Sequence, residues 1–235
     1  MIEVIPAIMP DSFTHLREEM SKVREYVPLV QIDVMDGVFV PPVTWPYHTP
    51  SDSDFEGVIS GEEDMPFLNE LEFEVDLMVA KQEQEAVRWI RAGAKRVIGH
   101  IEAIDDPAQF IRSVREATVP ADSPLSVEVG LAIGVETPIE EIEGLADVDF
   151  VQCMGIARIG YQGESFDERV IPMIRALRSV FPERIISVDG GVSEETATRL
   201  VEAGAERLVS GSAIFEADNK EEVISHLRSL SHPNP

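Results

Sequence analysis

The sequence predicts a single (β/α)8 barrel, an α/β fold of the TIM-barrel type. Short β-branched runs alternate with longer amphipathic stretches along all 235 residues, as expected for parallel βαβ units. Hydrophobic residues make up 44% of the chain and charged residues 27%, which suffices for one large core. No linker or low-complexity tract interrupts this pattern, so we expect residues 1–235 to form one domain.

Eight strands and seven helices are expected in alternation. The strands are predicted near residues 2–8, 29–35, 72–79, 95–101, 125–131, 148–154, 184–189 and 206–210. The helices are predicted near residues 12–25, 82–92, 106–117, 137–146, 166–180, 194–203 and 219–229. Helix starts are supported by Asp11, by Thr137 and Pro138, and by Ser193 with Thr196. The segment 41–71 takes the place of the second helix, and its prolines, serines and acids predict mostly loop with at most a short helix near its end.

Charge and cysteine content narrow the classes of partner. A formal net charge of −25 disfavours nucleic acid and anionic membranes, because attraction to either needs a basic surface. A small phosphate remains compatible, because backbone N–H groups can bind it without lysine. Cys153 is the only cysteine, which excludes an intrachain disulfide and a zinc site of cysteine pairs. With no signal-like or membrane-spanning run, we expect a cytoplasmic protein without a membrane partner.

Aspartates on three of the predicted strands are the first candidate site. Side chains alternate along a barrel strand, so the apolar set of each strand faces the helices and the other set faces the interior. The inward set comprises Gln31, Asp33, Met35, Glu74, Asp76, Met78, Ser187 and Asp189. Asp33, Asp76 and Asp189 thus converge near the carboxyl ends of strands, where barrel active sites lie. Burial and mutual repulsion would suit them to proton transfer; alternatively, they are structural carboxylates bonded to loop amides.

Two glycine-rich loops form the second candidate site. Gly190 and Gly191 follow the seventh strand, and Gly211 and Ser212 follow the eighth and begin a short helix. Loops at these positions with a short extra helix are the usual phosphate cradle of a barrel, where backbone N–H groups hold the dianion. The alternative is that they are tight turns that need glycine at positive φ.

Motifs along the chain resemble those of the ribulose-phosphate 3-epimerase family. The family's VDVMDGxFVPN, VHLMV, VHxEA and GLALNPxTP are similar to IDVMDGVFVPP at 32–42, VDLMV at 75–79, GHIEA at 99–103 and GLAIGVETP at 130–138. Its MSVxPGFGGQxF, VDGGI and VAGSAIF are similar to the segment that starts at Met154, to SVDGGV and to VSGSAIF. The order is kept and only 43–71 lacks a counterpart, so the resemblance implies a ribulose-phosphate-binding barrel.

The resemblance implies roles for particular residues. Family members bind a divalent metal through two histidines and two aspartates, and the aspartates move the C3 proton on either face of an enediolate. Asp33 and Asp189 match those aspartates. The methionines that line the family's site are matched by Met35, Met78 and Met154, and its phosphate cradle by Gly190, Gly191, Gly211 and Ser212.

Departures from the family bear on the metal. Gln31 and Asp76 stand where the family has its two histidines. Oxygen ligands suit Mg²⁺ or Mn²⁺ better than Zn²⁺, so we expect either a cation held by Asp33, Asp76, Asp189 and the Gln31 carbonyl, or a metal-free site. Ala7 replaces the serine of the family's PSIL. Arg158 lies in a loop without the family's PGFGGQ, either pairing with a substrate anion or facing solvent.

The leading functional hypothesis is an isomerase that inverts one carbon of a small phosphorylated ketose through Asp33 and Asp189. Two other hypotheses stay open: a related barrel with another enolate chemistry, such as decarboxylation or aldol cleavage, and a catalytically inactive sugar-phosphate-binding protein. The sequence also leaves a homo-oligomer open.

Overall fold

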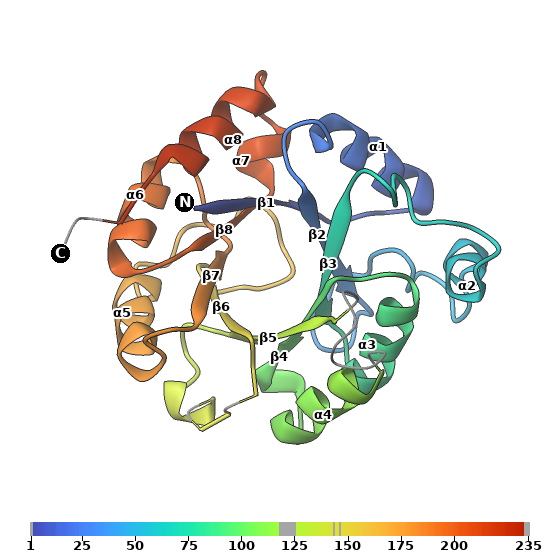
Figure 1. Ribbon diagram of the computed structural model, residues 1–235, viewed down its shortest axis with the longest axis horizontal. Coiled ribbons are helices and arrows are strands. Elements are labelled where there is room, and N and C mark those ends of the chain that lie inside the picture. The colour runs from blue at the N-terminus through green and yellow to red at the C-terminus, as the bar shows by residue number, and fades with distance from the viewer. Residues whose placement is uncertain (1, 118–125, 143, 146, 233–235) are drawn as a thin grey trace.

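Eight parallel strands close into a barrel in the computed structural model, which describes residues 2–117, 126–142, 144–145 and 147–232 (Figure 1). Each strand pairs with the next in sequence, and the eighth pairs with the first. The strands are β1 (Glu3–Ile8), β2 (Leu29–Met35), β3 (Glu72–Met78), β4 (Arg96–His100), β5 (Glu128–Ile133), β6 (Phe150–Met154), β7 (Ile185–Asp189) and β8 (Arg207–Ser210). The predicted (β/α)8 barrel is confirmed.

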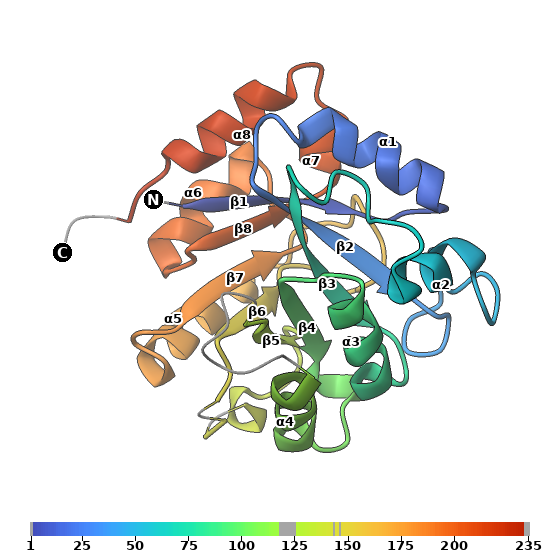
Figure 2. The same ribbon diagram turned by 45° about the vertical axis from the view of Figure 1, so that its right-hand side comes forward.

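Helices surround the ring of strands (Figures 1 and 2). They are α1 (Phe13–Val23), α2 (Ser53–Ser60), α3 (Gln82–Arg91), α4 (Pro107–Ala117), α5 (Val170–Val180), α6 (Glu194–Ala203), α7 (Ser212–Phe215) and α8 (Lys220–Ser229), with 3-10 turns η1 (Ile101–Ala103) and η2 (Ile139–Glu141). The inner side of this layer is apolar because the outward strand residues, such as Val30, Val75 and Val188, pack against helix residues in one core cluster. The predicted alternation of inward and outward residues is thus correct for β2, β3 and β7.

Some predicted elements have different boundaries. β5 extends to Ile133 instead of ending at 131, because Ala132 and Ile133 pair with residues of β6; its predicted start at 125 lies outside the described residues. The predicted helix 137–146 is wrong within the described part, which holds only the turn η2, and Gly144 has a positive φ of 90°. α5 begins at Val170 rather than 166, because Phe166 is bridged to Ile156 in the preceding loop.

Helix caps and the segment 41–71 also differ from expectation. The N-cap of α1 is Ser12, whose hydroxyl accepts from the His15 amide, rather than Asp11. The Ser193–Thr196 capping box is confirmed. The helix within 41–71 lies mid-segment rather than near its end, because Asp52 caps it and Gly61 ends it at a φ of 76°. Phe55 of this helix stacks on Trp89 of α3, which anchors the segment outside the barrel.

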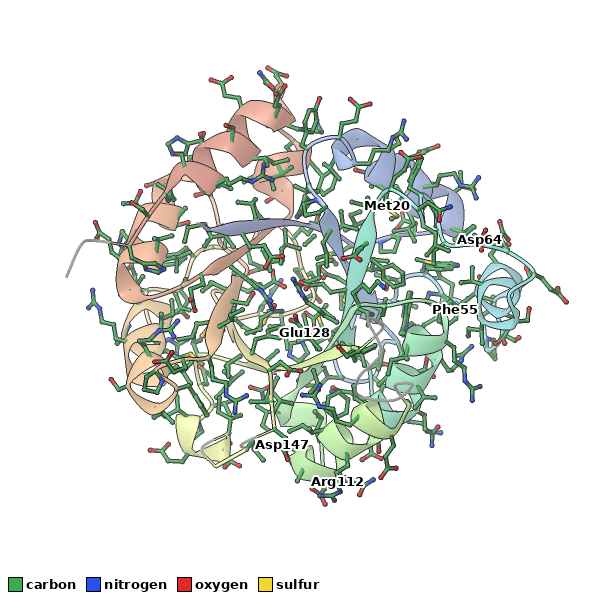
Figure 3. The ribbon with its side chains drawn as sticks, in the orientation of Figure 1. Met20, Phe55, Asp64, Arg112, Glu128 and Asp147 are labelled. Carbon is green, nitrogen blue, oxygen red and sulfur yellow. The ribbon has the colours of Figure 1, made fainter. Side chains whose placement is uncertain are left out.

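Charged residues fill the amino-terminal end of the barrel. Arg96 donates to Glu74 at 3.1 Å and to Glu3 at 2.9 Å, and Arg207 donates to Glu3 at 2.7 Å and to Glu128 at 3.0 Å. Figure 3 shows Glu128 inside the ring of strands. Burial raises the pKa of Glu74 to about 7, although the charges of Arg96 and Arg207 act in the opposite direction. This network lies away from the carboxyl ends of the strands, so its role is structural.

None of the helices in the described residues is both long enough and apolar enough to span a membrane.

Candidate active site

Three buried aspartates meet inside the barrel near the carboxyl ends of their strands. Asp33 of β2 lies opposite Asp76 of β3 in the strand register, and Asp189 is the last residue of β7. One carboxylate oxygen from each lies within 4.8 Å of the other two. Asp76 is fully buried, whereas Asp33 and Asp189 are 7% and 9% exposed and line a pocket. Two of the three carboxylates can therefore touch a ligand.

Side-chain amides hold the carboxylates in place. The Gln31 Nε2 lies between Asp33 Oδ1 and Asp189 Oδ2 and donates to both at 2.7 Å. On the other side, Gln152 Nε2 donates to Asp189 Oδ2 at 3.4 Å and to Asp76 Oδ2 at 3.5 Å. These donors offset part of the cost of burying carboxylates.

An imidazole holds the deepest carboxylate. His100, the last residue of β4, is fully buried, and its Nε2 lies 2.9 Å from Asp76 Oδ1. Burial lowers the pKa of His100, but the charge and hydrogen bond of Asp76 outweigh it, so the pKa is raised. Phe39 covers the imidazole, with ring centroids 5.4 Å apart. Asp76 is thereby fixed beneath the two pocket-facing carboxylates.

Burial and mutual repulsion raise the pKa values of the pocket-facing pair. The pKa of Asp33 rises well above 3.8, first because of burial and then because of the charges of Asp189 and Asp76. Burial and the charge of Asp76 raise the pKa of Asp189 to about 7, although the hydrogen bond from Gln31 lowers it. A carboxyl with a pKa of about 7, as for Asp189, can both accept and release a proton near neutral pH, and the pKa of Asp33 is shifted in the same direction.

The pocket above these carboxylates has a volume of about 430 Å³. Its floor includes Asp33, Asp189, Met78 and Met154, and its sides are the loops after β6, β7 and β8. Glu164, Glu195 and Glu216 also line it, and we call these three residues the acidic rim. Within the described part of the chain, no lysine, arginine or histidine lines the pocket. An anionic ligand would therefore have to be held by backbone N–H groups or by a cation.

Close packing explains the glycines after β7. A Cβ at Gly190 would lie 2.7 Å from Ile156, and one at Gly191 would lie 2.9 Å from the Phe166 Cα. Both glycines have positive φ, 90° and 67°. The loop after β6 thus folds directly over them and closes one side of the pocket. The Gly190 N–H is bonded to the Asp189 carboxylate and lowers its pKa, so this amide already has a partner.

The other predicted site residues divide into two groups. Gly191, Gly211 and Ser212 line the pocket together with Met78 and Met154. Met35 does not line it, and instead packs below with Val40 and Met78. Arg158 does not line it either, because it pairs with Glu164 at 2.8 Å and lies over the Tyr161 ring.

Sequence reasoning missed two polar residues of the site, His100 and Gln152. The alternation rule contains the signal for both. Applied to β6, it places Phe150, Gln152 and Met154 inward, and applied to β4 it places His100 inward. A buried glutamine between two apolar inward residues is also costly without hydrogen-bond partners, although less so than a carboxylate.

Oxygen atoms around the triad could hold a divalent cation. The three aspartates offer ligand atoms close together, and the buried Gln31 Oε1 has no hydrogen-bond partner in the described structure. If the Gln31 amide turned over, this oxygen would face both carboxylates in place of Nε2, and the turn needs no backbone movement. The residues therefore fit a cation that prefers oxygen ligands.

These features define a barrel enzyme with its site at the usual face, where strand-end carboxylates underlie a pocket closed by glycine-rich loops. The sequence profile of the ribulose-phosphate 3 epimerase family matches residues 3–215. The ribulose-phosphate 3-epimerase of Bacillus subtilis is 31% identical over 97% of this chain and 99% of its own length. The chloroplastic ribulose-5-phosphate-3-epimerase of Arabidopsis thaliana is 32% identical over 99% and 78%. The chain belongs to the ribulose-phosphate 3-epimerase family, a family of isomerases.

Solved structures support the fold. The alignment with KGPDC from Streptococcus mutans, solved in complex with D-ribose 5-phosphate, covers 97% of this chain and 95% of the KGPDC chain, with a TM-score of 0.68 and 14% identity. The 3-hexulose-6-phosphate synthase from Salmonella typhimurium covers 96% of each chain, with a TM-score of 0.66 and 16% identity. At these identities the likeness concerns the barrel alone.

Proposed function

We propose that this protein epimerises a ketopentose phosphate at C3, with Asp33 and Asp189 as the two acid–base groups. The observation that carries the proposal is that these two carboxylates reach the pocket from β2 and β7, while Asp76 stays beneath them. Inversion of a carbon requires proton removal on one face and proton delivery on the other, so it needs two such groups. The family match supports ribulose 5-phosphate and its C3 epimer as the substrate pair.

The phosphate end of the substrate would bind at the loops after β7 and β8. Gly191, Gly211 and Ser212 line the pocket there, and their N–H groups would be the donors. Gly190 shapes its loop, and its N–H bonds the Asp189 carboxylate. Backbone donors suit a dianion in a pocket that lacks basic side chains. Replacing Gly211 with valine should weaken phosphate-ester binding, because a Cβ there would already lie 2.8 Å from Gln162 Nε2. Unchanged affinity in calorimetry would contradict this assignment.

For the cation, we propose Mg²⁺ or Mn²⁺ rather than Zn²⁺. Asp33, Asp76 and Asp189 would hold it, with Gln31 Oε1 as a fourth ligand, and all four are oxygen donors. A cation there supplies positive charge that stabilises an enediolate. Metal analysis of the purified protein tests the assignment, and stoichiometric zinc would overturn it. Activity that resists chelators would instead indicate a metal-free site, in which protein donors such as the amides of Gln31 and Gln152 lie near the carboxylates.

We place the protein in the cytoplasm, since its one cysteine, Cys153, is buried and unpaired in β6. The hypotheses of another enolate chemistry gain no support of their own, because the solved synthase and KGPDC structures share only the fold with this chain. The family match favours an isomerase over an inactive binding protein.

Deuterium exchange tests the proposed reaction. In D₂O, the wild type should convert ribulose 5-phosphate to its C3 epimer and incorporate deuterium at C3. Asp33→Asn and Asp189→Asn should each lower epimerisation by about 100-fold or more, the effect of removing a positioned acid or base. Each variant should keep same-face exchange with only one of the two epimers, because abstraction and return on one face need one carboxylate. Wild-type turnover rates in both variants would make these residues structural.

A further inference from the structure

Gln152 is a fully buried amide inside the barrel that does not line the pocket. It lies in the middle of β6, beside Ser187 of β7 in the strand register. Its nitrogen donates to Asp189 Oδ2 and Asp76 Oδ2, at 3.4 and 3.5 Å. It cannot touch a ligand, yet it contacts one carboxylate that can.

The orientation of this amide is fixed by its neighbours. The Ser187 hydroxyl donates to Gln152 Oε1 at 3.2 Å, while the nitrogen end faces two carboxylate oxygens. A turned amide would point its oxygen at both carboxylates, which is repulsive. Gln31 differs, because either end of its amide can face the carboxylates, depending on whether a cation is bound.

The side-chain amides bond only one of the two oxygens of Asp189. Oδ2 receives N–H groups from both Gln31 and Gln152, whereas neither amide reaches Oδ1. The Gly190 N–H also bonds this carboxylate, so three donors together fix the orientation of the carboxyl group. Two donors on Oδ2 also restrict rotation of the carboxyl group.

Asp33 lacks this second support. Its Oδ1 accepts from Gln31, but no bond from Gln152 reaches it. The two acid–base groups therefore accept different numbers of side-chain amide bonds. Gln31 donates to both Asp33 and Asp189, whereas Gln152 donates to Asp189 and not to Asp33.

We propose that Gln152 is a positioning residue for Asp189, holding its Oδ2 so that the carboxyl group keeps the orientation in which it exchanges a proton with the substrate on that face only. This inference rests on the proposed epimerase function. It predicts that loss of Gln152 slows proton transfer on the Asp189 face and leaves the Asp33 face little changed.

The test measures the partitioning of the intermediate with the full-length protein in D₂O. For each epimer, the ratio of deuterium exchange in recovered substrate to conversion into product reports which face is reprotonated. In Gln152→Leu, the ratio should rise for the epimer deprotonated on the Asp33 face, because delivery from Asp189 is slow. It should fall for the other epimer. Each change should be about threefold to tenfold, the effect of losing one ordinary hydrogen bond, since the contact of 3.4 Å is long.

Matched variants separate positioning from structural damage. Ser187→Ala, which releases the Gln152 carbonyl, should shift both ratios in the same directions but less, and the double variant should match Gln152→Leu. Gln82 is a buried glutamine of α3 whose side chain bonds the His100 backbone outside the barrel interior. Gln82→Leu should lower the melting temperature without shifting either ratio. Circular dichroism verifies that each variant is folded. If Gln152→Leu does not fold, the shifts of the two ratios in Ser187→Ala decide whether Gln152 positions Asp189.

The outcomes distinguish this inference from the proposed function. Opposite shifts of the two ratios support the positioning role. If the wild type exchanges deuterium but both ratios stay unchanged or move together in Gln152→Leu, Gln152 is structural and the inference is overturned. If the wild type exchanges no deuterium at C3, the epimerase proposal itself fails, and this inference fails with it.

Discussion

Replacing Asp189 with asparagine should stabilise the metal-free protein at alkaline pH while it removes activity. Burial and the charge of Asp76 raise the pKa of Asp189 from 3.8 to about 7. A carboxyl whose pKa is higher in the folded state favours folding while it is protonated, and this contribution is lost as the pH rises through the folded-state value. Above pH 7, the ionised Asp189 therefore weakens folding, whereas a neutral asparagine does not.

The size of the effect depends on two opposing terms. A pKa of about 7 instead of 3.8 corresponds to about 4 kcal/mol of lost stability at pH 8. Asparagine offers Gln31 and Gln152 an uncharged and therefore weaker acceptor oxygen than the ionised Oδ2, at a cost of about 1 kcal/mol for each bond. We expect Asp189→Asn to be about 2 kcal/mol more stable than the wild type near pH 8. Near pH 4, where the wild-type carboxyl is mostly neutral, it should be about 1 kcal/mol less stable.

Urea unfolding in the presence of a chelator measures this reversal. Transition midpoints and slopes would be compared for both proteins from about pH 4 to about pH 8, because a constant slope ensures that the midpoint reports stability. Asp64 is an exposed aspartate at the molecular edge in Figure 3, and Asp64→Asn should change stability little at either pH. If Asp189→Asn is less stable by the same amount at every pH, the electrostatic reasoning is refuted.

Three further predictions test the surroundings of the site. Gly190→Ala should lower the free energy of unfolding, measured in urea, by about 3 kcal/mol, against about 1 kcal/mol for Gly61→Ala. Both glycines have positive φ, but only at position 190 would the added Cβ clash, with Ile156. Raising salt from about 20 to about 500 mM should lower KM for a phosphate ester several-fold in initial-rate assays, since the acidic rim repels the anion. Arg207→Met should lower the free energy of unfolding by about 3 kcal/mol and leave KM unchanged. The loss should be larger at pH 9 than at pH 6, because Glu74, with a pKa of about 7, is ionised at pH 9 and needs the arginine charge.

The fold was predictable because each of its elements carries a local signal. Strands such as Leu29–Met35 alternate apolar and polar residues, and this period fixes both the element and the direction of each side chain. The signals failed where one residue decides the geometry. Asp52 and Gly61 create α2 inside a segment whose composition indicates loop. Near residue 139, the described residues form only a short 3-10 turn, although a proline and a threonine indicate a helix start.

The aspartates of the site were predictable, but their partners were not. A carboxylate at an inward position is costly, so Asp33, Asp76 and Asp189 stand out in the sequence without any knowledge of their surroundings. Which donor bonds which oxygen depends on how the strands are brought together when the barrel closes. Gln152 and Asp76 are 76 positions apart, yet their side chains meet. No local pattern encodes that contact.

Gln31 and Asp76, which stand where the motif resemblance implies histidines, give the centre a consistent chemistry. Gln31 and Asp76 substitute oxygen-bearing side chains for imidazoles, and Asp76 adds a third buried negative charge. That charge raises the pKa of Asp189 further, and without hydrogen-bond partners it would destabilise the fold. His100 and Gln152 offset this cost, because both bond Asp76 from β4 and β6, strands that carry none of the three aspartates. The substitutions therefore act as a unit: restoring a histidine at position 76 alone would leave His100 and Gln152 without the carboxylate that they now bond.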